Sequence, residues 1–435
     1  MLNIYAIIVL ATLLGSYLLS TVADLLNLRA MAPELPAEFD DVYDADSYRR
    51  SQQYTRVRSR FALWPRSFNL LLLLGFWFGG GFEWLDSQLR ALGLAPLLTG
   101  LLFIAALMGG QLLLNLPFQL YGTFVIEERF GFNRTTAKTF VGDRLKGLLL
   151  AVALGGPVGA LILTLFEQAG ELAWLYCWLA STALILLLQF VAPSWLMPIF
   201  LKFTPLEDGE LRQRILDYAR AVDFPVDNLF VVDGSRRSSK ANAFFTGFGR
   251  HRRIGLFDTL IDRHSPEELL AIVAHEVGHY KKRHVIQGMV VSILHLGILL
   301  FVFGYLMGQP ALYAAFGMEH SSVYAGLVFC SLLYQPVELM LSLWMLSRSR
   351  KHEFEADRFA VETTGLGEAL VQGLKKLSRD SLGNLTPHPG YVLLHYSHPP
   401  MLQRIGAIRQ VAVAGSVAGS MAGSTAGSVA GSTAG

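Results

Sequence analysis

The chain has 435 residues, of which 52% are hydrophobic and only 16% are charged. Soluble globular proteins carry about 25% charged residues, so this composition excludes an ordinary soluble domain and predicts a membrane protein with some polar mass attached. The formal net charge of +2 comes without a block of basic residues, which argues against a nucleic-acid partner. Cys177 and Cys330 lie in apolar segments and are too few for a disulfide framework.

Seven runs with little or no charge are predicted to span the membrane. A span needs about 20 apolar residues to cross about 30 Å of hydrocarbon. The first run, about 3–24, lacks the basic region and cleavage site of a signal peptide, so we interpret it as a retained span. The remaining six runs are about 63–82, 91–126, 147–166, 172–201, 285–306 and 322–347.

Basic residues are distributed unevenly between the spans. Arginine and lysine are dense in 27–66, 127–146, 202–284 and just after 347. They are sparse in 83–97, 167–171 and 307–321. The positive-inside rule places the dense segments in the cytoplasm, with the N-terminus outside and the C-terminus inside. We expect a multi-pass protein of the cytoplasmic (inner) membrane in a bacterium, or of the endoplasmic reticulum in a eukaryote.

The polar insert 202–284 is predicted to begin with an amphipathic helix and a small sheet. The helix covers about 206–222, and strands are expected at 228–233, 241–245 and 253–257, the last two around a Gly247-Phe248-Gly249 turn. An edge strand of such a sheet can pair with an extended peptide.

A helix with a metal-binding pattern follows the sheet. Ser265-Pro266-Glu267-Glu268 supplies an N-cap, proline at the first position and acidic groups in the first turn. In His275-Glu276-Val277-Gly278-His279, the two histidines share one helical face and can hold one Zn²⁺. Glu276 can take a proton from water at the metal. We interpret His284, which follows three basic residues, as marking the membrane interface.

Two histidines leave a zinc site short of a protein ligand. After the last span, Glu353 and Asp357 are four residues apart and share a helical face, whereas Glu355 points to nearly the opposite side. A ligand carboxylate and a carboxylate that orients a ligand histidine fit Glu353 and Asp357, in that order. His352 is the competing ligand.

The chain ends in a repeat of small residues that begins at Val413-Ala414-Gly415-Ser416. Such a tract has too little apolar bulk to pack, so a disordered Ala/Gly/Ser tail is expected over 411–435. The predicted domains before it are a membrane domain, 1–201, and a zinc-peptidase domain, 202–410, which includes the last two spans.

The pattern His275-Glu276-Val277-Gly278-His279 followed by Glu353-Phe354-Glu355-Ala356-Asp357 resembles the integral-membrane CAAX prenyl protease family of zinc metallopeptidases. Three further stretches agree: 238–247, 253–260, and Tyr396-Ser397-His398-Pro399-Pro400 with Arg404. The resemblance covers about residues 1–410. It implies a mostly α-helical multi-pass fold, with about seven transmembrane helices enclosing a chamber and a small α/β zinc-peptidase portion on the cytoplasmic side.

The resemblance also implies the roles of the site residues. His275, His279 and Glu353 would bind one Zn²⁺ per chain, and Glu276 would be the general base. Asp357 and His398 would complete the catalytic set, with His398 helping to stabilise the tetrahedral oxyanion. Substrate-binding residues would be Asn242, beside the edge strand, and Arg404, near the metal.

These features predict a membrane-embedded zinc metalloendopeptidase that hydrolyses peptide bonds, as CAAX prenyl proteases do when they remove C-terminal residues of prenylated proteins. Its partners would be a peptide or lipidated protein substrate and the lipid bilayer, and we expect a monomer. One alternative is a membrane-protein quality-control zinc protease, a type that usually has fewer spans. Another is a transporter or receptor with structural zinc, but structural sites fill all four positions with protein ligands.

Overall fold

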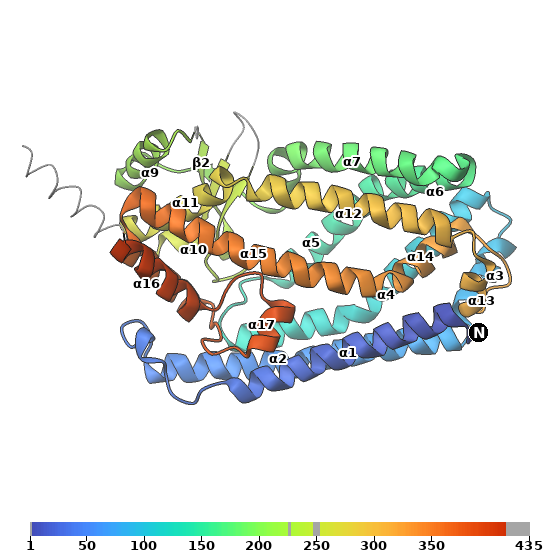
Figure 1. Cartoon of the computed structure of the whole chain (residues 1–435), viewed down its shortest axis with the longest axis horizontal. Helices are drawn as coiled ribbons and strands as arrows, with labels where there is room; N and C mark the ends of the chain where they lie inside the picture. Colours follow the sequence, from blue (N-terminus) through green and yellow to red (C-terminus); the bar gives the residue numbers. More distant parts are fainter. Residues whose placement is uncertain (1, 225–227, 247–252, 415–435) are drawn as a thin grey trace, which may run out of the picture. The chain divides into compact units, whose positions relative to one another are not determined.

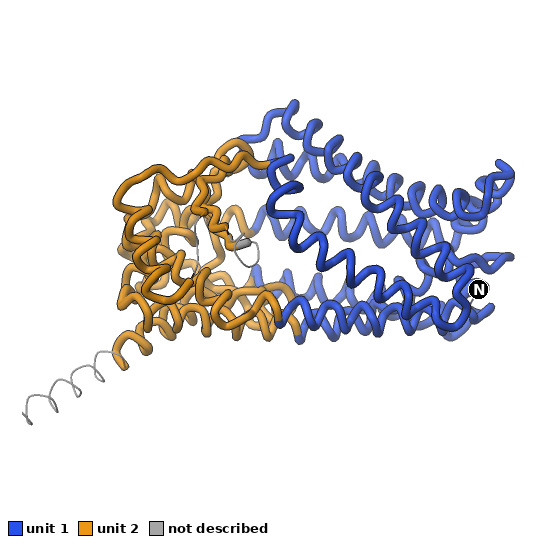
Figure 2. Tube along the Cα trace, turned by 90° about the horizontal axis from the view of Figure 1, so that it is seen from above, with its two compact units in different colours: residues 1–28, 56–200, 287–344 blue, residues 29–55, 201–286, 345–435 orange. Residues whose placement is uncertain are grey.

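The structure is a computed structural model that describes residues 2–224, 228–246 and 253–414. These residues fold into two compact units, each built from three separate stretches of the chain. Unit 1 consists of residues 1–28, 56–200 and 287–344, and unit 2 of residues 29–55, 201–286 and 345–435 (Figure 2). The predicted domains 1–201 and 202–410 are continuous blocks of sequence, and that division stays a prediction.

Long apolar helices make up unit 1 (Figure 1). In the described residues, six helical segments are long and apolar enough to cross a membrane: Ile4–Ala30 (α1), Ala45–Phe78 (α2), Pro96–Glu127, Ala137–Gln168, Gly170–Phe200 and His284–Leu306 (α12). A seventh is broken, because α14 (Val323–Leu333) and α15 (Gln335–Thr364) meet at a bend of 52° beside Pro336. These segments correspond to the seven predicted spans.

Three of the spans contain a turn of π-helix. The first joins α4 (Pro96–Tyr121) to η2 (Gly122–Glu127), the second passes from α5 (Ala137–Leu150) through η3 (Ala151–Gly155) to α6 (Gly156–Gln168), and the third from α7 (Ala173–Val191) through η5 (Ala192–Leu196) to α8 (Met197–Phe200). Pro193 lies in η5, where its missing N–H favours a widened turn. Short elements between spans are α3 (Gly81–Ala91) and α13 (Pro310–Ala315), and η4 (Gly170–Leu172) begins the span Gly170–Phe200.

The core of unit 1 is rich in aromatic side chains. Phe316 stacks on Phe329 with ring centroids 4.0 Å apart and on Trp77 at 4.7 Å. All three side chains are fully buried. The indole N–H of Trp77 donates to the carbonyl of Ala315 at 2.9 Å, so its polar group is satisfied inside this core.

Unit 2 contains a four-stranded mixed sheet in the order β1-β2-β4-β3. Strand β1 (Phe203–Pro205) is antiparallel to β2 (Asn228–Val232), which is parallel to β4 (Arg253–Phe257). Strand β3 (Ala243–Thr246) is antiparallel to β4 and forms the edge. The predicted strands correspond to β2, β3 and β4, whereas three-residue β1 is too short to show a period in sequence. The predicted Gly247–Gly249 turn lies outside the described residues.

Helix α11 (Pro266–Lys281) contributes six buried hydrophobic residues to the core of unit 2 and packs against β3, α9 (Glu210–Ala221) and α16 (Gly367–Asp380). The Ser265 hydroxyl accepts from the Glu268 N–H at 3.3 Å, and the Glu268 carboxylate accepts from the Ser265 N–H at 3.1 Å. The predicted N-cap is therefore confirmed, and such a cap contributes about 1 kcal/mol. Shorter helices of this unit are α10 (Asp258–Ile261) and α17 (Pro389–His395).

The segment between the first two spans folds against α16. Phe39 of η1 (Ala37–Phe39) is completely buried in the core of unit 2. Lys375 of α16 is also buried, and its ammonium group lies 2.7 Å from the carboxylate of Glu38 and 3.1 Å from that of Asp41. A buried ammonium group requires such partners, so the segment is held by both packing and charge.

The last described helix covers residues 401–414. The predicted tail, 411–435, therefore begins inside a helix, and its remainder from 415 lies outside the described residues.

Candidate metal centre

Two histidines of α11 form the first part of the centre. Because they are four residues apart, His275 and His279 lie one turn apart on the same helical face. Their Nε2 atoms are 3.2 Å from each other. The side chain of His275 is 10% exposed and that of His279 is 22% exposed, so both face the interior of unit 2.

Helix α15 supplies the third group. Glu353 places Oε2 3.5 Å from Nε2 of His275 and Oε1 3.3 Å from Nε2 of His279. The two helices approach closely at Gly278, where an added Cβ would lie 3.0 Å from the Cα of Ala356. Glycine inside the motif therefore permits the backbone contact that brings the carboxylate to the histidines.

The three groups fit a zinc ion. Their ligand atoms all lie within 4.8 Å of one another, and no other such group occurs among the residues that the structure describes. Ligands of tetrahedral zinc at about 2.0–2.1 Å are about 3.3 Å from one another, close to the separations found here. Oε2 of Glu353 is buried and receives no hydrogen bond. Two imidazoles and one carboxylate leave one position open, which is typical of catalytic zinc.

Nδ1 of His275 contacts a buried ion pair formed by Asp357 and Arg404. Nδ1 of His275 donates to Oδ1 of Asp357 at 2.8 Å. The Arg404 guanidinium donates to both oxygens of Asp357, at 2.6 and 2.8 Å, and lies 3.2 Å from Oε2 of Glu353. Burial opposes charge on His275, but the hydrogen bonds to Asp357 and Glu353 raise its pKa to about 9. Metal entering this site therefore displaces a proton.

Arg404 is only 5% exposed, so the structure does not place it as an ordinary surface arginine. Its bidentate contact joins the C-terminal helix to α15. Arg404 is therefore linked to two of the three ligands. It contacts Glu353 directly, and it is connected to His275 through Asp357.

A cavity of about 550 Å³ opens beside the ligands, and Glu276 lines it together with His275 and Glu353. Burial raises the pKa of the Glu276 carboxyl group above its ordinary value, against the opposing charges of the two histidines. A carboxylate that binds a proton more readily than usual, next to a metal site, has the properties of a general base.

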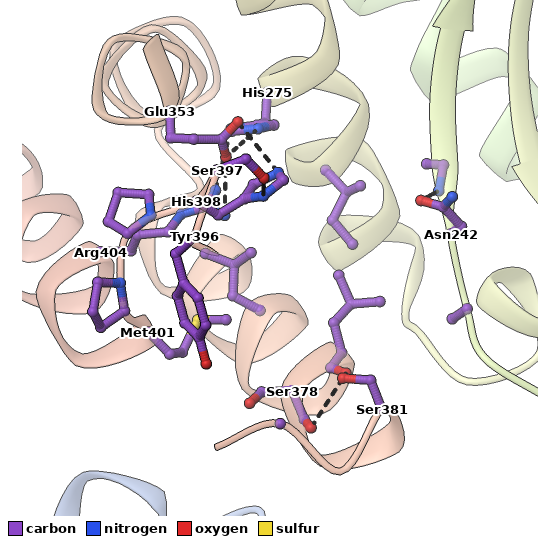
Figure 3. Close-up of a pocket in the computed structure, with 18 of the residues that line it drawn as sticks. Asn242, His275, Glu353, Ser378, Ser381, Tyr396, Ser397, His398, Met401 and Arg404 are labelled. Atoms are coloured by element: carbon purple, nitrogen blue, oxygen red, sulfur yellow. Dashed lines mark hydrogen bonds and ion pairs between the residues drawn. The ribbon is translucent and has the colours of Figure 1, made fainter. Parts of the chain in front are cut away.

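Two further predicted residues line the same cavity from different elements (Figure 3). Nε2 of His398 lies 3.4 Å from Oε1 of Glu353, and the hydroxyl of Ser397 is 2.9 Å from its Nδ1. Asn242 lies on the strand side, directly before edge strand β3. Its backbone carbonyl accepts a hydrogen bond from Phe257, and its side chain accepts one from the N–H of Ala243.

His284, interpreted as a marker of the membrane interface, is the first residue of the candidate span α12 and also lies beside the metal centre. His284 is only 6% exposed, and its Nδ1 lies 3.0 Å from Nδ1 of His279. Its Nε2 lies 3.0 Å from Oε2 of Glu355. His352, the competing ligand, is stacked on His284 with ring centroids 3.9 Å apart, and the group with ligand geometry contains Glu353 instead.

Two family models match consecutive parts of the sequence. Residues 24–202 match the CAAX prenyl protease N-terminal region, described as five membrane helices, and residues 205–412 match peptidase family M48. A CAAX prenyl protease 1 homolog from Arabidopsis thaliana is 36% identical over 403 residues, covering 90% of this chain and 94% of that protein. The Saccharomyces cerevisiae CAAX prenyl protease 1 is 33% identical over 406 residues, covering 87% and 89%.

The fold is also found in a solved structure. The crystal structure of S. mikatae Ste24p is similar with a TM-score of 0.88 at 30% sequence identity. The similarity covers 94% of this chain and 100% of the Ste24p chain.

Proposed function

Because the chain belongs to the CAAX prenyl protease family of M48 peptidases, we propose that it cleaves prenylated proteins near a C-terminal CAAX sequence. The family and the membrane spans make the chain a multi-pass membrane metallopeptidase. One observation carries the proposal for the site: the ligand atoms of His275, His279 and Glu353 converge beside a cavity that His275, Glu353 and Glu276 line.

In the proposed mechanism, the imidazoles of His275 and His279 and the carboxylate of Glu353 would hold one Zn²⁺ per chain. When bound, zinc supplies a Lewis acid that polarises the scissile carbonyl and makes water a stronger nucleophile at neutral pH. Glu276 accepts the proton of the attacking water and passes it to the leaving amine. The raised pKa of Glu276 supports this role, because the group has to take up a proton and hold it briefly.

The other site residues bind the substrate or position the ligands. The exposed imidazole of His398 donates to the carbonyl oxygen as negative charge develops there. Asn242 and edge strand β3 bind the extended substrate backbone by strand addition. Asp357 orients the imidazole of His275. Arg404 lines the cavity and contacts the substrate there.

We further propose that the catalytic side faces the cytoplasm and the N-terminus faces outward. The arginine-rich segments 27–66 and 127–146 support this orientation, as does the basic segment just after residue 347. A protein that matures cytosolic prenylated substrates needs its active site on this side of the membrane.

The test is a cleavage assay with two quenched peptides of identical sequence, one farnesylated on the CAAX cysteine and one unmodified. Wild-type protein purified in detergent should cleave the farnesylated peptide, lose activity with a chelator and recover it with Zn²⁺. Glu276→Gln should abolish cleavage and still bind one zinc, because the exchanged side chain is not a ligand. Glu362→Gln alters an exposed carboxylate on the same helix as Glu353 and serves as the control.

Full activity of zinc-replete Glu276→Gln would overturn the assignment of the base. Equal cleavage of the two peptides would overturn the prenyl preference and favour the quality-control protease. A protein that binds zinc tightly but cleaves neither peptide nor any unfolded membrane protein would favour the structural-zinc alternative.

A further inference from the structure

His284 lies against the metal centre because the chain turns sharply after α11. Arg283 adopts a left-handed backbone conformation with φ of 59°, and α12 then begins at His284. In one continuous helix, residues five apart point to different faces, so His284 would lie away from His279. The turn instead brings their Nδ1 atoms to 3.0 Å.

We propose that His284 and Glu355 are positioning residues that fix the orientation and tautomer of the ligand His279 through a hydrogen-bond chain. This inference rests on the proposed zinc site and extends it to residues outside the ligand set. The chain runs from the Glu355 carboxylate to Nε2 of His284, and from Nδ1 of His284 to Nδ1 of His279.

The direction of each hydrogen bond follows from the chemistry of the groups. An ionised carboxylate only accepts, so Nε2 of His284 carries the hydrogen that it donates to Glu355. In a neutral imidazole the other nitrogen is then an acceptor, so Nδ1 of His284 accepts from Nδ1 of His279. This leaves Nε2 of His279 with a free lone pair, and that atom faces Glu353 and His275.

The two ligand histidines are therefore oriented by the same helix in two ways. Asp357 of α15 accepts directly from Nδ1 of His275, whereas Glu355 of α15 acts on His279 through His284. Both arrangements turn Nε2 towards Glu353. The ring of His352, parallel to that of His284 within 5°, restricts the rotation of His284.

Outer partners of metal-bound histidines typically change metal affinity by about 10- to 100-fold when removed. We expect this range for His284→Phe, which keeps a ring to stack on His352 but has no nitrogen. His284→Asn can place an oxygen near the Nδ1 position and should restore most of the affinity. Glu355→Leu should weaken zinc binding, while Glu355→Gln keeps an acceptor oxygen and should remain near wild type.

The experiment measures zinc dissociation constants of the full-length protein in detergent by chelator competition. A second readout is the visible absorption of the Co²⁺-loaded protein, which reports ligand geometry without turnover. His352→Phe is the matched control, because it preserves the stacked ring outside the chain of hydrogen bonds. If His284→Phe fails to fold, the zinc affinity of Glu355→Leu tests the proposal instead. The Glu355 side chain is 38% exposed, so its replacement should not prevent folding.

Weaker zinc binding in His284→Phe and Glu355→Leu, with rescue by His284→Asn and Glu355→Gln, supports the proposal. Wild-type affinity and an unchanged Co²⁺ spectrum in both of the disruptive variants would overturn it while leaving the proposed function intact. A wild-type protein that binds no zinc would overturn both.

Discussion

Replacing Gly278 by alanine tests whether the contact between α11 and α15 sets the spacing of the metal ligands. The new Cβ would lie 3.0 Å from the Cα and 3.1 Å from the carbonyl oxygen of Ala356, and 3.3 Å from a ring carbon of Phe359. Because the two shortest contacts are to backbone, α15 itself must move by a few tenths of an ångström. Glu353 lies one turn earlier on α15 and moves with it.

Two effects on stability oppose each other. Alanine is favoured over glycine inside a helix by about 1 kcal/mol. Overpacking a well-packed contact costs about 1–3 kcal/mol, so the net loss should stay below about 2 kcal/mol and the protein should fold. Zinc binding has no such compensation, because metal ligands tolerate displacements of only about 0.2 Å. We expect zinc affinity to fall at least about tenfold, which corresponds to 1.4 kcal/mol.

Zinc dissociation constants and the cleavage rate of the farnesylated peptide, both measured in detergent, check this prediction. The control is Gly373→Ala in α16, which also packs against α11. There, the nearest atom is the end of the flexible Ile272 side chain at 3.3 Å, so the contact can relax. Wild-type zinc affinity and turnover in Gly278→Ala would refute the reasoning that this contact sets the ligand spacing.

Two other predictions concern charged groups in the core of unit 2. Arg404→Lys keeps the charge but loses the bidentate contact with Asp357, so we expect a lower unfolding temperature and several-fold weaker zinc binding. Lys375→Met should destabilise the protein at neutral pH by about 1 kcal/mol, because it removes the ammonium partner that Glu38 and Asp41 share. Burial opposes their charge, yet Lys375 together with Arg409 lowers the pKa of the Glu38 carboxyl, and Gln372 together with Lys375 lowers that of Asp41. This pairing therefore contributes its full stability at pH values above the ordinary carboxyl pKa, near 4. The contribution is lost as the pH falls through the lowered pKa values of the folded protein.

Unfolding temperatures as a function of pH check the Lys375 prediction. The difference between wild type and Lys375→Met should shrink in acid, and a constant difference across the pH range would contradict it. For Arg404, the control is Arg409→Lys on the same helix, where the ion pairs with Glu38 and Glu368 are exposed. An equal loss of zinc affinity in both arginine variants would argue against a specific effect on Asp357.

The predictable parts of the site depend on local geometry. Helical periodicity alone places His275 next to His279 and Glu353 next to Asp357, and Ser265 marks the start of the metal helix. The spans follow from their length and lack of charge. Each of these signals is contained within a few helical turns of sequence.

The features that were missed depend on contacts or backbone conformations that sequence patterns do not report. The left-handed Arg283 interrupts the helix between α11 and α12, and His284 then lies at the metal centre. No periodicity predicts that conformation for an arginine, since it is sparsely populated for side chains of this size. The pairing of Lys375 with Glu38 joins residues more than three hundred positions apart, and strand β1 has only three residues.

The order of the ligands along the chain has a consequence for biosynthesis. His275 and His279 are translated before α12 and the broken span of α14 and α15, whereas Glu353 comes near the end of α15. A nascent chain that is still being inserted therefore has two of the three ligands and cannot hold zinc in the arrangement described here. We therefore expect proteolytic activity only after α15 has been made and folded, and none in a chain that is truncated before Glu353.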